Sequence, residues 1–145
     1  MSRKIVHVVG TGTIGEPLIG LLSDFKAKLG IDEITFHKNS PLTTDRSKVR
    51  NLMRRGARLT THEEKFDGFN SLGLKPEFTT EQAIDRASVV IDCTPKGYGH
   101  KNKVDYYEKF LHNTKGFIAQ GSEVGFGKMY ARGINDEALN TDEDR

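Results

Sequence analysis

The chain has 145 residues and a formal net charge of +2, with 35% hydrophobic and 29% charged residues. Its length suits one domain spanning residues 1–145, and a mean hydropathy of -0.56 leaves no room for a membrane-spanning helix. The apolar run near the N-terminus is too short for a signal peptide, Cys93 has no second cysteine to pair with, and the five histidines lack metal-ligand spacing. We therefore expect a cytoplasmic domain with neither a disulfide nor a metal.

The first elements alternate between strand and helix. KIVHVV, residues 4–9, is an apolar β-branched run typical of a buried strand. After it, residues 14–29 repeat apolar side chains at spacings of three and four, which predicts an amphipathic helix ending near Gly30. DEITFHK, residues 32–38, indicates a second strand.

The same alternation continues along the chain. We expect a helix over 48–54, a strand over 57–61, a polar loop from about 62 to 75, a helix over 80–86, a strand over 88–95, a helix over 103–113 and a strand over 116–121. Strands that alternate with helices predict an α/β fold of the Rossmann type, a doubly wound and mostly parallel sheet with helices on both faces. The acidic segment 134–145 is poor in core-forming residues and favours a disordered tail.

A glycine-rich loop, GTGTIG, joins the first strand to the first helix. In a G-x-G-x-x-G loop of this context, Gly10 makes the turn, Gly12 lets the backbone approach a pyrophosphate, and Gly15 permits close helix packing. The start of the helix adds unpaired N–H groups that suit an anion. The alternative is a bare turn in which Thr13 and Glu16 form a capping box, and Glu16 would repel a phosphate if its side chain pointed inward.

The end of the second strand bears on the choice of cofactor. An NAD site normally has Asp or Glu about 20 residues beyond the loop, whereas a basic residue there accommodates the 2′-phosphate of NADP. This chain has Lys38, Asn39 and Ser40 at that place and no acid. We therefore expect binding of NADP, or of both NADP and NAD, with a solvated Lys38 as the alternative.

Several motifs resemble the archaeal-type, or type II, glyceraldehyde-3-phosphate dehydrogenases, in their N-terminal dinucleotide-binding half. GTGTIG is similar to the family's G-Y-G-T-I-G, and KNSP at 38–41 falls where the family has K-T-R-P. VVIDCTPKGYGHKNK, residues 89–103, is the most specific match, and AQGSE at 119–123 is similar to the family's Q-G-G-E. The resemblance covers roughly residues 4–125 and implies a glycolytic oxidoreductase that is oligomeric at full length.

The resemblance also implies the site residues. It places the pyrophosphate on the glycine loop, the adenosine 2′-phosphate near the end of the second strand, the adenine beside the strand over 88–95 and the nicotinamide half near the strand over 116–121. The corresponding residues are Gly10, Gly12, Thr13, Ile14 and Gly15, then Lys38, Asn39 and Ser40, then Thr94 and Pro95, and finally Gly121. The chain departs from the family pattern at Glu16, Ser40 and Ser122. The first two each remove a positive charge from the anion site, which predicts weaker or less selective NADP binding.

The family's chemistry needs a thiolate nucleophile, which it carries in an S-C-N-T stretch that this chain lacks. Cys93 ends an apolar strand, where a buried and inert thiol is expected, so we predict no catalytic residue. The chain is expected to lack the catalytic domain, to bind the cofactor and to be inactive alone.

Two alternatives stay open. The chain could be a complete, free-standing nucleotide-binding module. It could also bind nucleic acid through the basic stretch 46–58, although its lack of aromatic residues favours a solvated helix face and no nucleic-acid partner.

Overall fold

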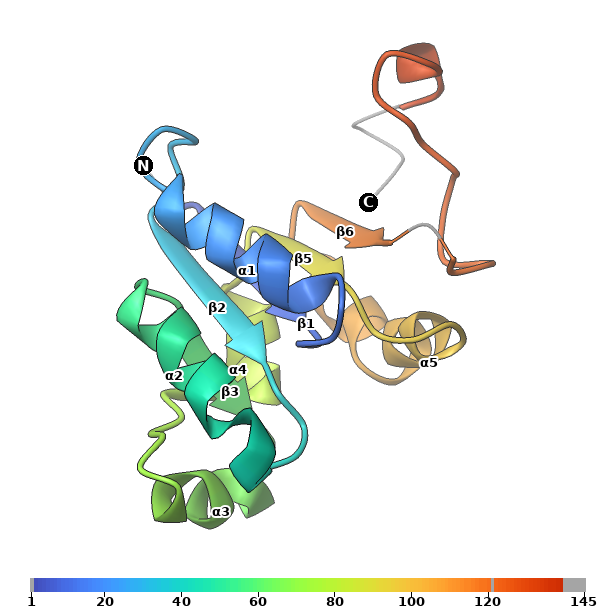
Figure 1. The fold of residues 1–145 in the computed structure, drawn as a ribbon. Helices are drawn as coiled ribbons and strands as arrows, with labels where there is room; N and C mark the ends of the chain where they lie inside the picture. The colour runs from blue at the N-terminus through green and yellow to red at the C-terminus, as the bar shows by residue number, and fades with distance from the viewer. Residues whose placement is uncertain (1, 121, 140–145) are drawn as a thin grey trace.

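The computed structural model describes residues 2–120 and 122–139, and its centre is one sheet of six parallel strands (Figure 1). From one edge to the other, the strands are β4 Phe78–Thr79, β3 Arg58–Thr61, β2 Glu33–His37, β1 Ile5–Val9, β5 Val89–Asp92 and β6 Gly116–Ala119. The chain moves outward from β1 through β2, β3 and β4, and then returns to β5 on the other side of β1. The carboxyl ends of β1 and β5 therefore form the point at which the strand order reverses.

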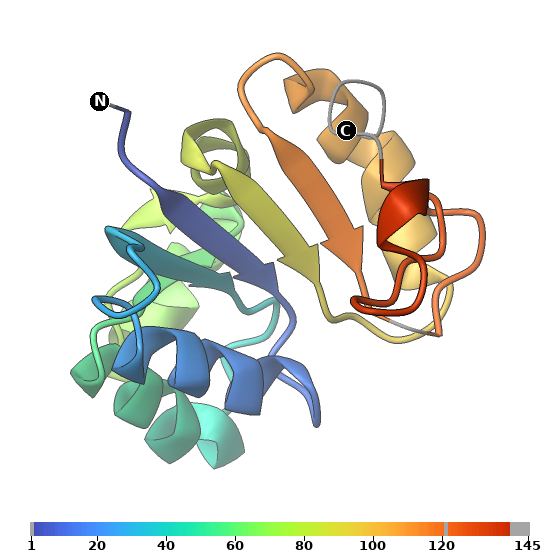
Figure 2. The ribbon, with the colours of Figure 1, turned by 90° about the horizontal axis from the view of Figure 1, so that it is seen from above.

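Helices cover the two faces of this sheet (Figure 2). One face carries α1 Gly15–Asp24, α2 Arg46–Arg54 and α3 Phe66–Ser71, and the other carries α4 Thr80–Arg86 and α5 Tyr98–Asp105. Short 3₁₀ turns lie at Thr43–Asp45, Glu63–Lys65, Tyr107–Phe110 and Asp136–Ala138. The expected doubly wound, Rossmann-like fold is confirmed, and the sheet is entirely parallel. Among the described residues, none of the helices combines the length and apolarity needed to cross a membrane.

The two faces of the sheet differ in polarity. On the α1 face, buried Val8, Phe36 and Leu59 belong to an apolar core. Because successive residues of a strand point to opposite faces, the α4 face receives His37 and Asp92 among other polar groups, and these are also buried. Burial of polar groups is costly unless they are hydrogen-bonded, so the α4 face holds a network of such bonds.

Helix α1 is shorter than the leucine pattern predicts. It ends at Asp24, and a turn then leads to Gly30, whose positive φ of 65° suits glycine. The residue of α1 that is fully buried is Ile19, whereas Leu21 and Phe25 are half exposed. The predicted stripe is therefore partly wrong, because the buried side of α1 carries Gly15, Ile19 and Gly20. Gly15 lies against Gly10 of the loop, and Gly20 lies against the side chain of Arg55.

The polar loop predicted for residues 62–75 is wrong. It contains the 3₁₀ turn at Glu63–Lys65 and helix α3, which together bring Phe69 into the core. Helix α3 has six residues, too few to show an apolar period in the sequence. Strand β4 was also missed, since it has only two residues.

The last predicted helix, over 103–113, is also displaced. Helix α5, Tyr98–Asp105, begins six residues after the end of β5, behind the left-handed Gly97, and a separate 3₁₀ turn follows at Tyr107–Phe110. Tyr107 is buried, whereas Val104 and Leu111, which would share its side of the predicted helix, are exposed. The segment therefore packs mainly through Tyr107 of the 3₁₀ turn, with Tyr106 and Phe110 beside it, and not through a continuous helical stripe.

Candidate functional site

The glycine loop lies at the carboxyl edge of the sheet, between β1 and α1. Gly10 has a φ of 100°, and its N–H donates to the carbonyl oxygen of His37 at the end of β2 (3.3 Å). A Cβ atom on Gly15 would lie 1.9 Å from the carbonyl oxygen of Gly10. The fold itself therefore requires glycine at both positions, as predicted for the turn and for close packing of the helix.

Gly12 differs from these two glycines. It is exposed, its φ is not in the left-handed region, and a Cβ atom there would have nothing within 4 Å. No contact within the described chain requires glycine at this position. The open space above Gly12 is where a ligand could approach the backbone of Gly12, Thr13 and Ile14 closely.

The first turn of α1 has no side-chain cap. Its N-cap residue is Ile14, which makes no capping hydrogen bond, so the capping box proposed for Thr13 and Glu16 is wrong. The carboxylate of Glu16 instead forms an ion pair with Lys48 of α2 (3.5 Å). Because the first N–H groups of a helix have no partner within the helix, this end of α1 can bind an anion, and Lys48 reduces the repulsion from Glu16.

The residues predicted at the end of β2 lie beside the loop but are not free side chains. Lys38 is buried and forms an ion pair with Asp45 (Nζ–Oδ2 2.7 Å), so the alternative of a solvated Lys38 is wrong. Asn39 accepts a hydrogen bond from the ammonium group of Lys65 (2.5 Å). Ser40 follows at the start of the loop toward α2.

A buried carboxylate, which the sequence did not single out, organises the end of β5. Asp92 accepts hydrogen bonds from the backbone N–H and hydroxyl of Thr94, from the amide of Asn102 (3.0 Å) and from the hydroxyl of Tyr107 (2.5 Å). Thr94 and Pro95, the predicted residues of this segment, therefore sit on a turn that is tied to α5. Gly121, predicted near the nicotinamide half, lies outside the described residues.

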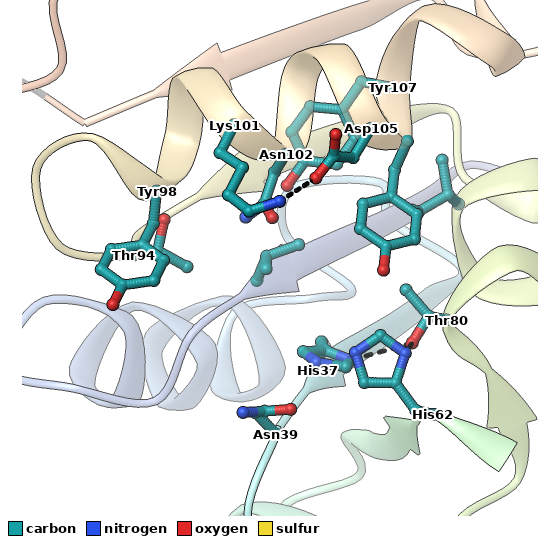
Figure 3. A pocket seen from close by; sticks show the side chains of 13 residues that line it. His37, Asn39, His62, Thr80, Thr94, Tyr98, Lys101, Asn102, Asp105 and Tyr107 are labelled. Carbon is teal, nitrogen blue, oxygen red and sulfur yellow. Dashed lines mark hydrogen bonds and ion pairs between the residues drawn. The ribbon is translucent and has the colours of Figure 1, made fainter. Parts of the chain in front are cut away.

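A cavity of about 310 Å³ opens between these segments (Figure 3). Helix α5 and the turn after it form one wall, and the ends of β2 and β3 with the start of α4 form the other. Two of the predicted site residues, Asn39 and Thr94, line it, and so does Val9, which precedes the glycine loop. The other lining residues are His37, His62, Thr80, Ile84, Tyr98, Lys101, Asn102, Asp105, Tyr106 and Tyr107.

Histidines form the floor of this cavity, and the sequence did not predict them as site residues. The rings of His37 and His62 meet edge to face, with centroids 5.0 Å apart, and both lie within hydrogen-bonding reach of the hydroxyl of Thr80. The pKa of His37 is lowered to about 3, mainly by burial and to a smaller extent by the nearby His7, His62, Lys65 and Lys38. His37 is therefore neutral at physiological pH, and its flat ring adds no charge to the floor.

Cys93 is not an activated nucleophile in this structure. The thiol is buried at the end of β5, and burial, with the charge of Asp92 as a second cause, raises its pKa to about 11. The group is thus protonated at neutral pH, in agreement with the expected inert thiol.

The basic stretch 46–58 is used mainly within the fold. Val49 and Leu52 face the core, as predicted for a helix with one apolar side. The cations bind carbonyl oxygens or carboxylates of the chain: Arg46 to Leu72, Arg50 to Gly73, Lys48 to Glu16, Arg55 to Asp24, and Arg58 to Glu33 and Glu77. These contacts favour an intramolecular role for the stretch.

No family model matches the chain. Curated proteins do match it: it is 28% identical over 121 residues to a glyceraldehyde-3-phosphate dehydrogenase of Pyrobaculum islandicum, covering 81% of this chain and 31% of that protein. The enzyme of the same name from Methanobacterium bryantii is 33% identical over 73% of this chain and 30% of its own length. For Methanopyrus kandleri the identity is 29% over 98% of this chain and 40% of the relative. The chain thus spans 30% to 40% of the length of these relatives, and it is similar, over most of its own length, to about one third of an archaeal glyceraldehyde-3-phosphate dehydrogenase.

Proposed function

We propose that this chain is the dinucleotide-binding domain of a glyceraldehyde-3-phosphate dehydrogenase-like oxidoreductase and that it binds NAD or NADP. The observation that carries the proposal is Gly12, a glycine that no contact within the described chain explains. A backbone without a side chain, next to a helix end without a cap, is what close approach of a pyrophosphate needs. In this proposal the N–H groups of Gly12, Thr13 and Ile14 hold the pyrophosphate, while Gly10 and Gly15 shape the loop.

The adenosine half would occupy the cavity next to the loop. The carbonyl of His37 already accepts from the loop at Gly10, so the loop and the cavity floor are directly joined. Flat imidazole rings below and tyrosines on the α5 wall suit a planar base. Thr94 lines the same cavity, and in this proposal Pro95, which follows it, lies toward the adenine. Lys38, Asn39 and Ser40 would lie toward the adenosine ribose, and Gly121 toward the nicotinamide.

The bound cofactor would supply the hydride acceptor of the reaction. The residues of this chain would bind and orient it, with no catalytic residue among them, because Cys93 is buried and protonated. The relatives are about three times as long as their match to this chain. We therefore propose that the nucleophile lies outside the third of the relatives that this chain matches, and that this chain alone is inactive. We also propose that it works in the cytoplasm, with glycolysis as its pathway.

Calorimetric titration with NAD and with NADP tests this proposal. We expect the natural chain to bind at least one of them and Gly12→Val to lose that binding, because the added side chain fills the space that the pyrophosphate needs. Gly12→Val should keep the urea unfolding midpoint of the natural chain, since that space is empty in the fold. Binding that survives Gly12→Val would contradict the proposal.

A further inference from the structure

Two lysines lie near the end of β2, and the fold treats their charges differently. The ammonium group of Lys38 is 2.7 Å from the carboxylate of Asp45, and its side chain is only 10% exposed. This contact holds the pKa of the Asp45 carboxyl below its usual range, so the carboxylate is ionised near neutral pH. The charge of Lys38 is therefore already balanced, and its side chain is turned toward the Thr43–Asp45 turn.

Lys65 is the opposite case. It ends the 3₁₀ turn at Glu63–Lys65, it is half-buried, and its ammonium group donates to the side-chain oxygen of Asn39. Within the described parts of the chain no carboxylate forms an ion pair with it. Glu63 and Glu64, its neighbours in sequence, are exposed and are not paired with it.

The placement of Lys65 connects it to the cavity. Asn39, which it holds, lines the cavity together with His62, and His62 lies three residues before Lys65 (Figure 3). The bond from Lys65 fixes the amide of Asn39, so that the NH₂ group of Asn39 points away from the lysine and remains a donor. One cation and one amide donor thus meet at Asn39, which lines the cavity just after the end of β2.

We propose that Lys65, positioned by Asn39, is the cation that binds a phosphate group on the adenosine ribose, and thus the residue that determines how well the chain binds NADP relative to NAD. The inference rests on the proposed function of the site. A ribose phosphate carries between one and two negative charges at neutral pH and has three acceptor oxygens. The ammonium group of Lys65 has three donors, of which Asn39 uses one, so two stay available for these oxygens. The floor of the cavity adds no competing cation from His37, which is neutral.

The test is a pair of calorimetric titrations, with NADP and with NAD, on the natural chain and on Lys65→Gln. We expect Lys65→Gln to weaken NADP binding about tenfold, as for the loss of a hydrogen bond to a charged group, and to change NAD binding less than about twofold. Lys65→Arg keeps the charge and should keep most of the NADP affinity. Lys28→Gln, which removes one exposed charge from the turn after α1, is the matched control and should change neither affinity.

The outcomes separate this inference from the proposed function. A change in the ratio of NADP to NAD affinity in Lys65→Gln alone supports it, because a purely structural role would weaken both cofactors equally. If both cofactors bind and Lys65→Gln leaves the ratio unchanged, or if Lys38→Gln lowers it instead, the role of Lys65 is refuted while the dinucleotide site stands. If the natural chain binds neither cofactor, both proposals fail.

Discussion

A Cβ atom on Gly15 would lie 1.9 Å from the carbonyl oxygen of Gly10. The lack of a side chain on Gly15 therefore lets α1 begin close behind the end of β1, with its N-terminus at the carboxyl edge of the sheet. Gly12, two residues after Gly10, has no such contact. The same motif therefore contains glycines that the fold needs and one that, in our proposal, the ligand needs.

Stability measurements should separate these glycines. We expect Gly15→Ala to lower the free energy of unfolding by about 2–3 kcal/mol, because the added methyl group forces backbone to move in a close-packed contact. Gly12→Ala should change it by less than about 0.5 kcal/mol, since the methyl group would project into open space. Urea unfolding followed by circular dichroism measures both, and equal losses in the two variants would be inconsistent with this division.

The hydroxyl of Tyr107 should contribute to stability through Asp92. Tyr107→Phe removes one of the donors to a buried carboxylate, so we expect a loss of about 1.5–3 kcal/mol in the free energy of unfolding. Tyr98→Phe is the matched control, because Tyr98 is 59% exposed and should lose less than about 0.5 kcal/mol. Urea unfolding curves of the two variants give the comparison, and a Tyr107→Phe chain as stable as Tyr98→Phe would show that Asp92 does not depend on this bond.

Stability should fall as the pH is lowered from about 6.5 toward 4. Burial lowers the pKa of His7 to about 4 and that of His37 to about 3, whereas each is about 6.5 in the unfolded chain. Below pH 6.5 the unfolded state therefore binds more protons than the native state, and each histidine costs about 1.4 kcal/mol of stability per pH unit. Below this window, protonation of carboxylates causes a further loss of stability. Asp45 is an example, because its contact with Lys38 lowers its pKa.

Urea unfolding at several pH values between 4.5 and 7.5 checks this slope. His7→Gln should reduce it by about half, because one of the two protons no longer takes part. The exposed His112 serves as control, and His112→Gln should keep the full slope. A stability that is constant between pH 7 and pH 5 would mean that the two buried histidines are not neutral in the native state.

The thiol of Cys93 should react slowly in the native state. With its pKa raised to about 11, the native thiol is about one part in a thousand thiolate at pH 8, against roughly one part in ten for an ordinary cysteine. We expect alkylation by iodoacetamide at pH 8 to be about a hundredfold slower in the native chain than in urea, since the thiolate is the reacting species. Mass spectrometry follows the reaction, and equal rates would indicate an accessible, activated thiol.

The sequence predicted those elements whose signal is local. The strands β1, β2, β3, β5 and β6 are short runs rich in apolar and β-branched residues. Helix α4 begins with a capping box formed by Thr79 and Gln82. These signals depend on residues only a few positions apart. The parallel fold followed from their alternation, without knowledge of any tertiary contact.

The features that were missed depend on contacts between distant parts of the chain. Helix α3 is held by Phe69 in a core built from other elements, and its six residues alone predict little. Lys38 could be identified as a cation after β2, but its neutralisation by Asp45 is a product of the fold. The buried His37 and the meeting of Lys65 with Asn39 likewise bring together residues 25 or more positions apart.

The central claim is that the glycine loop of this chain binds the pyrophosphate of a dinucleotide. The most direct test is a nitrogen-15 NMR titration of the labelled chain with NAD and with NADP, which reports each backbone amide separately. We expect the largest shifts at the amides of Gly12, Thr13 and Ile14, with smaller shifts around Asn39 and Thr94 at the cavity. Shifts that leave the loop unchanged, or no shifts at saturating cofactor, would contradict the claim.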